Sequence, residues 1–137
     1  MPLIHLQSHV SYTMAQVLQT ILDVQAYPLF LPGCHGVLLI QKNQTSLVSE
    51  MRVAQNWQLV TTMRWDEKRV WFSNQCVQGL WMLSDGAPGT HIDLSIDRVD
   101  AGVFSPVVRA LLPHYLPTMQ HFFEKRLHAL YGSGSFN

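Results

Sequence analysis

The sequence predicts an α+β domain in which a curved antiparallel sheet of about seven strands wraps around one long C-terminal helix. Three observations predict this class: a strand-like segment followed by a short amphipathic helix, period-two hydrophobicity over residues 36–99, and a long helical pattern near the end. At 137 residues the chain has the length of one domain. We expect a single domain over residues 1–131 and a flexible Gly/Ser-rich tail over residues 132–137.

The first strand is expected over residues 2–10, where polar and apolar residues alternate. Its buried face would comprise Ile4, Leu6, Ser8 and Val10. Thr13 and Gln16 have the spacing of a capping box, in which each side chain satisfies a free backbone N–H at the start of a helix. The apolar stripe of that helix consists of Met14, Val17, Leu18, Ile21 and Leu22. The helix should end near Asp23.

The next segment, residues 23–34, contains aromatic residues, two prolines and a glycine in one short stretch. Because proline disfavours helix in the preceding residue, Tyr27 and Leu31 are expected to be extended or turn-like. Gly33 can supply the positive φ for a sharp exit into a strand. A stiff apolar segment between a helix and a run of strands indicates the rim or floor of an apolar cavity.

Turn signals divide residues 36–99 into about six strands of an antiparallel meander. The signals lie at residues 42–44, 55–56, 66–68, 78–79 and 84–89. One strand would place Trp57, Leu59, Thr61, Met63 and Trp65 on a single face. The next strand would continue through Val77, with Val70, Phe72, Asn74 and Cys76 on one face. In the last strand Asp93 and Asp97 point outward, opposite to Ile92, Leu94 and Ile96.

The last helix is expected to begin with Ser105 as N-cap and Pro106 as its first residue, and to end at Tyr131. Its buried face would consist of Val108, Leu111, Leu112, Tyr115, Met119, Phe122, Phe123, Leu127 and Leu130. Pro113 and Pro117 each remove a backbone donor, so a kink or a break is expected there. One helix cannot fill so large a sheet, and this predicts a cavity between them.

Composition narrows the function classes. Hydrophobic residues make up 47% of the chain and charged residues 13%, against roughly 25% charged in ordinary domains. The surplus of apolar side chains favours an internal pocket or a partner surface. The formal net charge of +0 argues against non-specific binding to a polyanion.

The cysteines and the apolar runs bear on metal sites and location. Cys34 and Cys76 have no zinc-site spacing, so no metal site is expected, and two free thiols fit a reducing compartment. The first residues carry no signal-peptide pattern and no apolar run could span a bilayer. A cytoplasmic protein is expected, with a peripheral contact to the inner membrane as an open alternative.

The element order and the segment Asp-Val-Gln-Ala-Tyr-Pro-Leu-Phe-Leu-Pro-Gly-Cys at residues 23–34 resemble the coenzyme Q-binding and ribosome-associated toxin A family. That family belongs to the START-like, polyketide cyclase/dehydrase superfamily. The last helix adds its M-x3-F-x2-R-x4-Y pattern as Met119, Phe123, Arg126 and Tyr131. The resemblance implies a helix-grip fold, with one or two short helices after the first strand. The family's Asp-Gly-Pro-Phe turn is missing, and residues 76–81 keep only Gly79 and Trp81 of its Gly-x-Trp region.

The resemblance implies a non-enzymatic binder or chaperone of a hydrophobic small molecule, with ubiquinone as the ligand and respiratory electron transport as the process supported. Ubiquinone is then a ligand and not a cofactor, and no catalytic residue is assigned. The expected cavity residues are Tyr27, Phe30, Leu31, Trp57, Met63, Trp65, Phe72, Trp81, Leu112, Tyr115, Met119 and Phe123. The same side chains could instead form ordinary core. Arg64 and Asn74 could orient a polar head group or carbonyl, or make structural hydrogen bonds.

Two other functions stay open. Bacterial members of the family are described as associating with the large (50S) ribosomal subunit and blocking subunit joining, and here the lysines and arginines are scattered instead of clustered. A cyclase or dehydrase would need an acid–base pair facing the cavity, and the outward Asp93 and Asp97 do not supply one. No DNA partner is expected.

Overall fold

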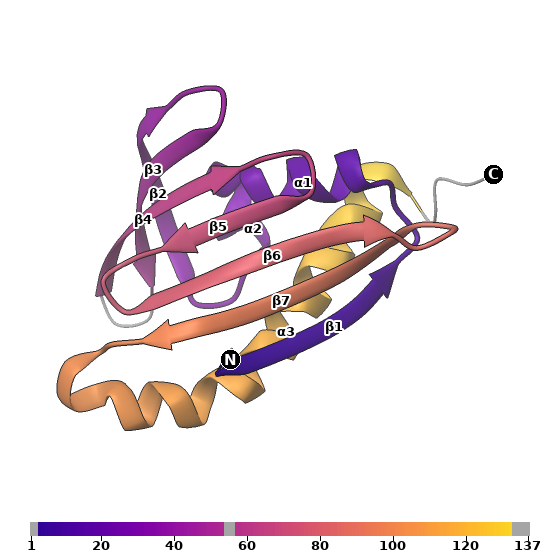
Figure 1. The fold of residues 1–137 in the computed structure, drawn as a ribbon. Helices are drawn as coiled ribbons and strands as arrows, with labels where there is room; N and C mark the ends of the chain where they lie inside the picture. The colour runs from indigo at the N-terminus through magenta and orange to yellow at the C-terminus, as the bar shows by residue number, and fades with distance from the viewer. Residues whose placement is uncertain (1–2, 54–56, 133–137) are drawn as a thin grey trace.

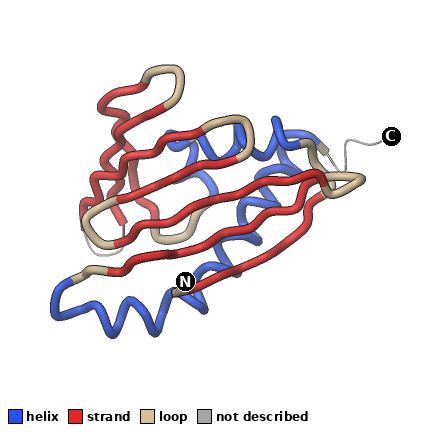
Figure 2. Tube along the Cα trace, viewed as in Figure 1, coloured by secondary structure: helices blue, strands red, loops and turns tan. Residues whose placement is uncertain are grey.

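The computed structural model describes residues 3–53 and 57–132. Along the chain its elements are β1 (Ile4–Val10), α1 (Met14–Leu22), a 3₁₀ turn (Val24–Ala26), α2 (Tyr27–Phe30), β2 (Cys34–Lys42), β3 (Ser46–Val53), β4 (Trp57–Trp65), β5 (Arg69–Ser73), β6 (Val77–Asp85), β7 (Thr90–Val99), a second 3₁₀ turn (Gly102–Phe104) and α3 (Ser105–Tyr131). The strands form one antiparallel seven-stranded sheet in the order β1-β7-β6-β5-β4-β3-β2. The helices cover one face of this twisted sheet (Figures 1 and 2). The predicted helix-grip fold is confirmed, whereas the predicted tail beyond Gly132 lies outside the described residues.

The beginning of the chain folds as its pattern predicts. In β1, Ile4, Leu6, Ser8 and Val10 lie on the more buried face. The capping box is present: Gln16 donates its backbone N–H to the Thr13 hydroxyl at 3.1 Å, and Thr13 donates its own to the Gln16 side chain at 3.0 Å. The helix α1 ends before Asp23, as expected.

The segment between α1 and β2 differs from its prediction at one residue. Tyr27 is helical, with φ −53° and ψ −41°, so the expectation of an extended Tyr27 is wrong. Pro28 is tolerated because it lies in the first turn of α2, where its missing N–H would have no helical partner. Leu31 is extended and Gly33 has φ 85°, both as expected. These two residues turn the chain sharply into β2.

The turn between β5 and β6 lies earlier than the sequence indicates. Strand β5 ends at Ser73, and the side-chain oxygen of Asn74 accepts the backbone N–H groups of Cys76 and Val77, each at 2.8 Å. Such an Asx turn reverses the chain without glycine or proline. The predicted turn at Gln78–Gly79 is wrong, because the ladder continues there: Gln78 pairs with Arg98 and Gly79 with Ile96, so Asp97 of β7 forms a bulge. A Cβ on Gly79 would lie 2.4 Å from the Phe72 ring, so the glycine leaves room for that ring.

At Pro113 and Pro117 a kink or a break was expected, and the break does not occur because α3 continues through both prolines. The helix changes direction along its length, in line with a kink, with its first turns outside the outline of the sheet and its second half behind the strands (Figure 1). This explains why Leu111 is 61% exposed although the helical pattern placed it in the core. The expectations of a buried Tyr115 and a buried Leu130 are wrong as well, since their exposed fractions are 40% and 45%. Leu116 is a core residue that the pattern did not include.

The start of α3 differs by one residue from its prediction. Phe104 occupies the N-cap position and Ser105 is the first helical residue. The Ser105 hydroxyl accepts the backbone N–H of Ala101 at 2.8 Å, so it stabilises the preceding turn instead of capping the helix. The fully buried core lies between the helices and the sheet and includes Val17, Ile21, Leu47, Leu83, Leu94 and Leu127.

Candidate functional site

The main cavity lies between α2, α3 and the inner face of the sheet, and its volume is about 360 Å³. This volume falls within the range of roughly 300–1,000 Å³ that is typical of small-molecule sites. The predicted residues that line it are Tyr27, Leu31, Met63, Phe72, Trp81, Leu112, Tyr115, Met119 and Phe123. They come from the segment before β2, from the middle strands and from one side of α3. The structure therefore brings together side chains that lie far apart in the sequence.

Three of the predicted cavity residues lie elsewhere. The ring of Phe30 packs behind the wall, 5.2 Å from the ring of Phe123, with the Arg126 guanidinium above it. Trp57, the first residue of β4, is 44% exposed, and its ring contacts the ring of Phe104. Trp65 is half-buried at the other end of that strand. Period-two alternation correctly predicts the face of β4, but the cavity covers only the middle of the strand.

Phe123 is the centre of an aromatic cluster that forms one wall. Its ring lies 5.4 Å from Tyr27, 5.2 Å from Phe30 and 5.5 Å from Trp81, with edge-to-face angles in each pair. Such pairs contribute about 0.5–1.5 kcal/mol each beyond the burial of their area. The cluster connects α2 to α3 and to β6, so this part of the wall is held from three sides.

Further wall residues were not among the expected cavity residues, although the sequence had offered one of them, Asn74, as a group that could orient a polar head group or carbonyl. They are Pro32, Gly33, Cys34, Met51, Val53, Leu59, Thr61, Asn74, Val77, Leu94, Ile96 and Leu116. Leu59 and Thr61 could have been found, since they alternate with Met63 on the same strand face. Leu116 could have been found as well, since it follows Leu112 by four residues and precedes Met119 by three on the same helix face.

The polar side chains of the cavity wall are few and uncharged. The described part of the wall contains no Asp, Glu, His, Lys or Arg. Burial raises the pKa of the Cys34 thiol above its ordinary value, against an opposing hydrogen bond from the Gly36 backbone. Burial also raises the pKa of Tyr27 and of Tyr115, so all three groups are protonated near neutral pH. The Tyr27 hydroxyl donates to the backbone carbonyl of Ile21.

Two buried hydroxyls have no hydrogen-bond partner among residues 3–53 and 57–132. They belong to Ser49 and Thr61, which face each other across the β3–β4 ladder. Thr61 lines the main cavity and Ser49 does not. A buried hydroxyl without a partner is uncommon in proteins, so Thr61 marks a polar position within the wall.

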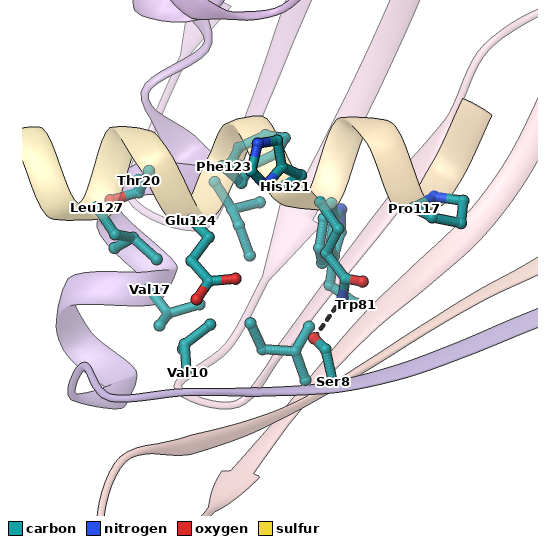
Figure 3. Close-up of a pocket in the computed structure, with 13 residues that line it drawn as sticks. Ser8, Val10, Val17, Thr20, Trp81, Pro117, His121, Phe123, Glu124 and Leu127 are labelled. Carbon is teal, nitrogen blue, oxygen red and sulfur yellow. Dashed lines mark hydrogen bonds between the residues drawn. The ribbon is translucent and has the colours of Figure 1, made fainter. Parts of the chain in front are cut away.

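A second, smaller cavity of about 170 Å³ lies between β1, α1 and α3. Trp81 and Phe123 line both cavities, so these two side chains separate them. Figure 3 shows the carboxylate of Glu124 reaching from α3 toward Val10 and Val17. The side chain of Gln120 donates a hydrogen bond to the Ser8 hydroxyl at 2.5 Å, drawn dashed in Figure 3. This second cavity has less than half the volume of the main cavity, and its wall includes His121 and Glu124, so it is the weaker candidate for an apolar ligand.

The described residues contain neither a metal-binding cluster nor a membrane-spanning helix. No group of three or more His, Cys, Asp or Glu side chains within residues 3–53 and 57–132 could hold a metal ion. In the same residues no helix has the length and hydropathy needed to cross a membrane.

Solved structures of other proteins share this fold. A structure from Thermus thermophilus matches with a TM-score of 0.75 at 14% identity, covering 93% of this chain and 97% of that chain. The STAR-related lipid transfer protein from Xanthomonas axonopodis matches with a TM-score of 0.70 at 11% identity, covering 90% of this chain and 84% of that chain. The Zhui aromatase/cyclase from Streptomyces sp. R1128 matches with a TM-score of 0.67 at 12% identity, covering 96% of this chain and 98% of that chain.

These identities establish a shared fold, and the names of these structures cover both a lipid carrier and an enzyme. No curated protein matches the chain at a significant level. The family described as polyketide cyclase / dehydrase and lipid transport matches residues 10–124, which is most of the chain. The chain therefore belongs to the polyketide cyclase/dehydrase and lipid transport family.

Proposed function

We propose that this protein binds a hydrophobic small molecule, ubiquinone, in the main cavity and carries it without changing it chemically. The observation that carries the proposal is the cavity of about 360 Å³ whose described wall holds no charged or imidazole side chain. An apolar ligand would exchange water for this wall on binding. A charged ligand would lose hydration and find no partner there.

Burial of the ligand supplies the binding energy. At about 25 cal/mol per Å², covering about 400 Å² of apolar ligand surface contributes about 10 kcal/mol. That contribution can offset the several kcal/mol of translational and rotational freedom lost on association. Met51, Met63 and Met119 line the cavity, and their unbranched side chains can adapt to an isoprenoid tail.

Binding without chemistry is supported by the state of the polar groups. General acid–base catalysis needs a side chain that exchanges protons near the working pH. The raised pKa values of Cys34, Tyr27 and Tyr115 keep these groups protonated, and no carboxylate or imidazole joins them in the described wall. The resemblance of residues 23–34 to the coenzyme Q-binding family supports ubiquinone in particular.

The proposal is tested by expressing the protein in a ubiquinone-containing host, extracting the gently purified protein with organic solvent and quantifying the extract by mass spectrometry. We expect close to one ubiquinone per chain. Leu112→Trp and Met119→Trp should fill the cavity and lose the ligand while the protein stays folded. Leu111→Trp is the matched control, because Leu111 lies on the same helix but is exposed.

An empty wild-type protein that also takes up no added ubiquinone would contradict the proposal. Equal ubiquinone content in Leu111→Trp and Met119→Trp would contradict the assignment of the cavity. After the first of these results, co-sedimentation with large ribosomal subunits would be measured next.

A further inference from the structure

Two polar side chains of the cavity wall have bonding capacity that the protein leaves unused. Thr61 is 5% exposed, and its hydroxyl oxygen is buried with no hydrogen-bond partner in the described part of the chain. Asn74 uses its side-chain oxygen to accept two backbone N–H groups of its turn. Its amide nitrogen donates to no residue within the described ranges. Both residues line the main cavity.

The sheet places these two residues next to each other. The β4–β5 ladder ends at the pair of Thr62 and Ser73; Thr61 precedes Thr62 in β4, and Asn74 follows Ser73 as the first residue of the turn. Asn74 also follows Phe72 by two positions, and Phe72 lines the same cavity. Side chains opposite each other on one face of an antiparallel pair have Cβ atoms about 4.5–5.5 Å apart. One ligand atom can therefore lie within reach of both.

The chemistry of the pair selects the kind of ligand atom. The oxygen of Asn74 is already occupied by Cys76 and Val77, so the free part of this amide can only donate. The Thr61 hydroxyl can donate as well, and it has no existing hydrogen bond to lose if it rotates about its Cα–Cβ bond toward the cavity. Two converging donors fit an acceptor with two lone pairs, and a carbonyl oxygen is such an acceptor that brings no donor of its own.

The presence of threonine instead of an apolar residue at position 61 also favours a polar ligand atom. Valine has nearly the shape of threonine and would leave no buried hydroxyl without a partner. Leu59 and Met63 flank Thr61 on the same strand face, so an apolar residue would fit the pattern of the wall. A polar residue here is explained by a polar ligand atom.

We propose that Thr61 and Asn74 form a carbonyl-binding corner, in which both donate hydrogen bonds to one carbonyl oxygen of an otherwise apolar ligand. This inference rests on the proposed function and deepens it. It restricts the ligand class to quinones and similar ketones instead of hydrocarbons, and it places the carbonyl end of the ligand beside β4 and β5. The apolar remainder then lies against the aromatic and methionine side chains.

The test uses two compounds that differ only in the carbonyl groups. Duroquinone and durene share a six-membered ring with four methyl groups, and only duroquinone carries two carbonyl oxygens. Because duroquinone is fully substituted, it has no free ring position at which Cys34 could add. Binding of each compound to the full-length protein is measured by equilibrium dialysis, with the free compound quantified by gas chromatography.

Thr61→Val should weaken duroquinone binding by about three- to tenfold, the effect of one lost hydrogen bond, and leave durene binding unchanged within about twofold. Thr61→Ser keeps the hydroxyl and should retain most of the duroquinone affinity. Asn74→Asp keeps the oxygen that the turn needs and removes the donor, so it should show the same selective loss. Ser49→Ala is the matched control, since it removes a buried hydroxyl outside the cavity wall.

The outcomes separate the two proposals. If wild-type protein binds neither compound, the proposed function fails and the carbonyl corner with it. If wild-type protein binds both, and neither Thr61→Val nor Asn74→Asp changes the ratio of the two affinities, the corner is overturned while the cavity remains a ligand site. Asn74→Asp alone decides the question should Thr61→Val not fold.

Discussion

Tyr27 links the three helices α1, α2 and α3 to one another. Its hydroxyl donates to the carbonyl of Ile21 at the end of α1, and its ring contacts Phe30 of α2 and Phe123 of α3. Burial of this phenol raises its pKa above the ordinary value of 10.0, with smaller contributions from Cys34 and Asp23. The residue is therefore held neutral by the same packing that closes the cavity.

This burial predicts a loss of stability at high pH. In the unfolded chain Tyr27 releases its proton near pH 10, whereas the folded state holds the proton to higher pH. The buried phenol of Tyr27 therefore contributes fully to the free energy of unfolding below about pH 10. This contribution declines as the pH rises further, because only the unfolded state gains from ionisation. Tyr27→Phe should lower the free energy of unfolding by about 1–2 kcal/mol at neutral pH. It should also show a shallower decline above about pH 10.

Urea unfolding at about pH 8 and about pH 11 measures both effects. Tyr131→Phe is a suitable control, because the one hydrogen bond of the Tyr131 hydroxyl within residues 3–53 and 57–132 is the long contact of 3.4 Å with the Gln19 side chain. An equal decline in wild type and Tyr27→Phe between the two pH values would show that the buried phenol does not govern alkaline unfolding.

At the scale of single residues, hydrophobic alternation predicts which face of a strand a side chain occupies, and it predicts little beyond that. Alternation along β4 correctly assigned Met63 and Trp57 to one face, but it carries no information on how far along the strand the cavity extends. That limit depends on where α3 crosses the sheet, which is a tertiary property. The hydroxyl of Thr61 had the same face assignment, and its missing partner can be seen only when every neighbour is placed.

Among the elements, the two that departed most from prediction also form the cavity. The β5–β6 turn was misplaced because Asn74 makes it through its side chain, while Gly79, which looks like a turn residue, instead leaves space for Phe72. The helix α3 continues through two prolines that favour interruption. Its tertiary contacts, with Leu116, Phe123 and Leu127 buried, outweigh the local cost of two lost hydrogen bonds.

The two prolines at the bend of α3 should lower the thermal stability of the protein and favour ubiquinone binding. Replacing Pro113 and Pro117 by alanine restores two backbone donors, and a proline inside a helix costs up to about 3 kcal/mol. The double variant should therefore melt at a higher temperature than wild type. Its straighter helix should displace Leu112 and Met119 from the sheet, and ubiquinone uptake should fall several-fold.

Calorimetry and ubiquinone uptake are measured on the same preparations. Pro106→Ala is the control, because Pro106 lies in the first turn of α3, where a proline removes no helical hydrogen bond. Undiminished uptake in the double variant would show that the bend does not shape the cavity.

The molecule as a whole combines a neutral chain, few charged residues and an apolar cavity enclosed between one sheet and one long helix. The order of the elements and their alternation predicted this architecture almost completely, because each element has a clear period and the turns between most strands carry strong signals. The ligand could not be predicted with equal certainty, since the same fold serves a lipid transfer protein and an aromatase/cyclase.

A neutral, cavity-bound ligand predicts a specific thermal response. A short-chain ubiquinone at about a hundred times its Kd should add about 2.7 kcal/mol to the stability of the native state. For a domain of this size the Tm should then rise by on the order of 10 °C in differential scanning calorimetry. The shift should be the same in low and high salt, because no counterions are released when a neutral molecule binds, in contrast to a contact with ribosomal RNA. Met119→Trp, whose added ring occupies the cavity, should show almost no shift. If that variant responded as wild type does, the quinone would stabilise the protein from another surface, and the smaller cavity between β1 and α3 would be the next to test.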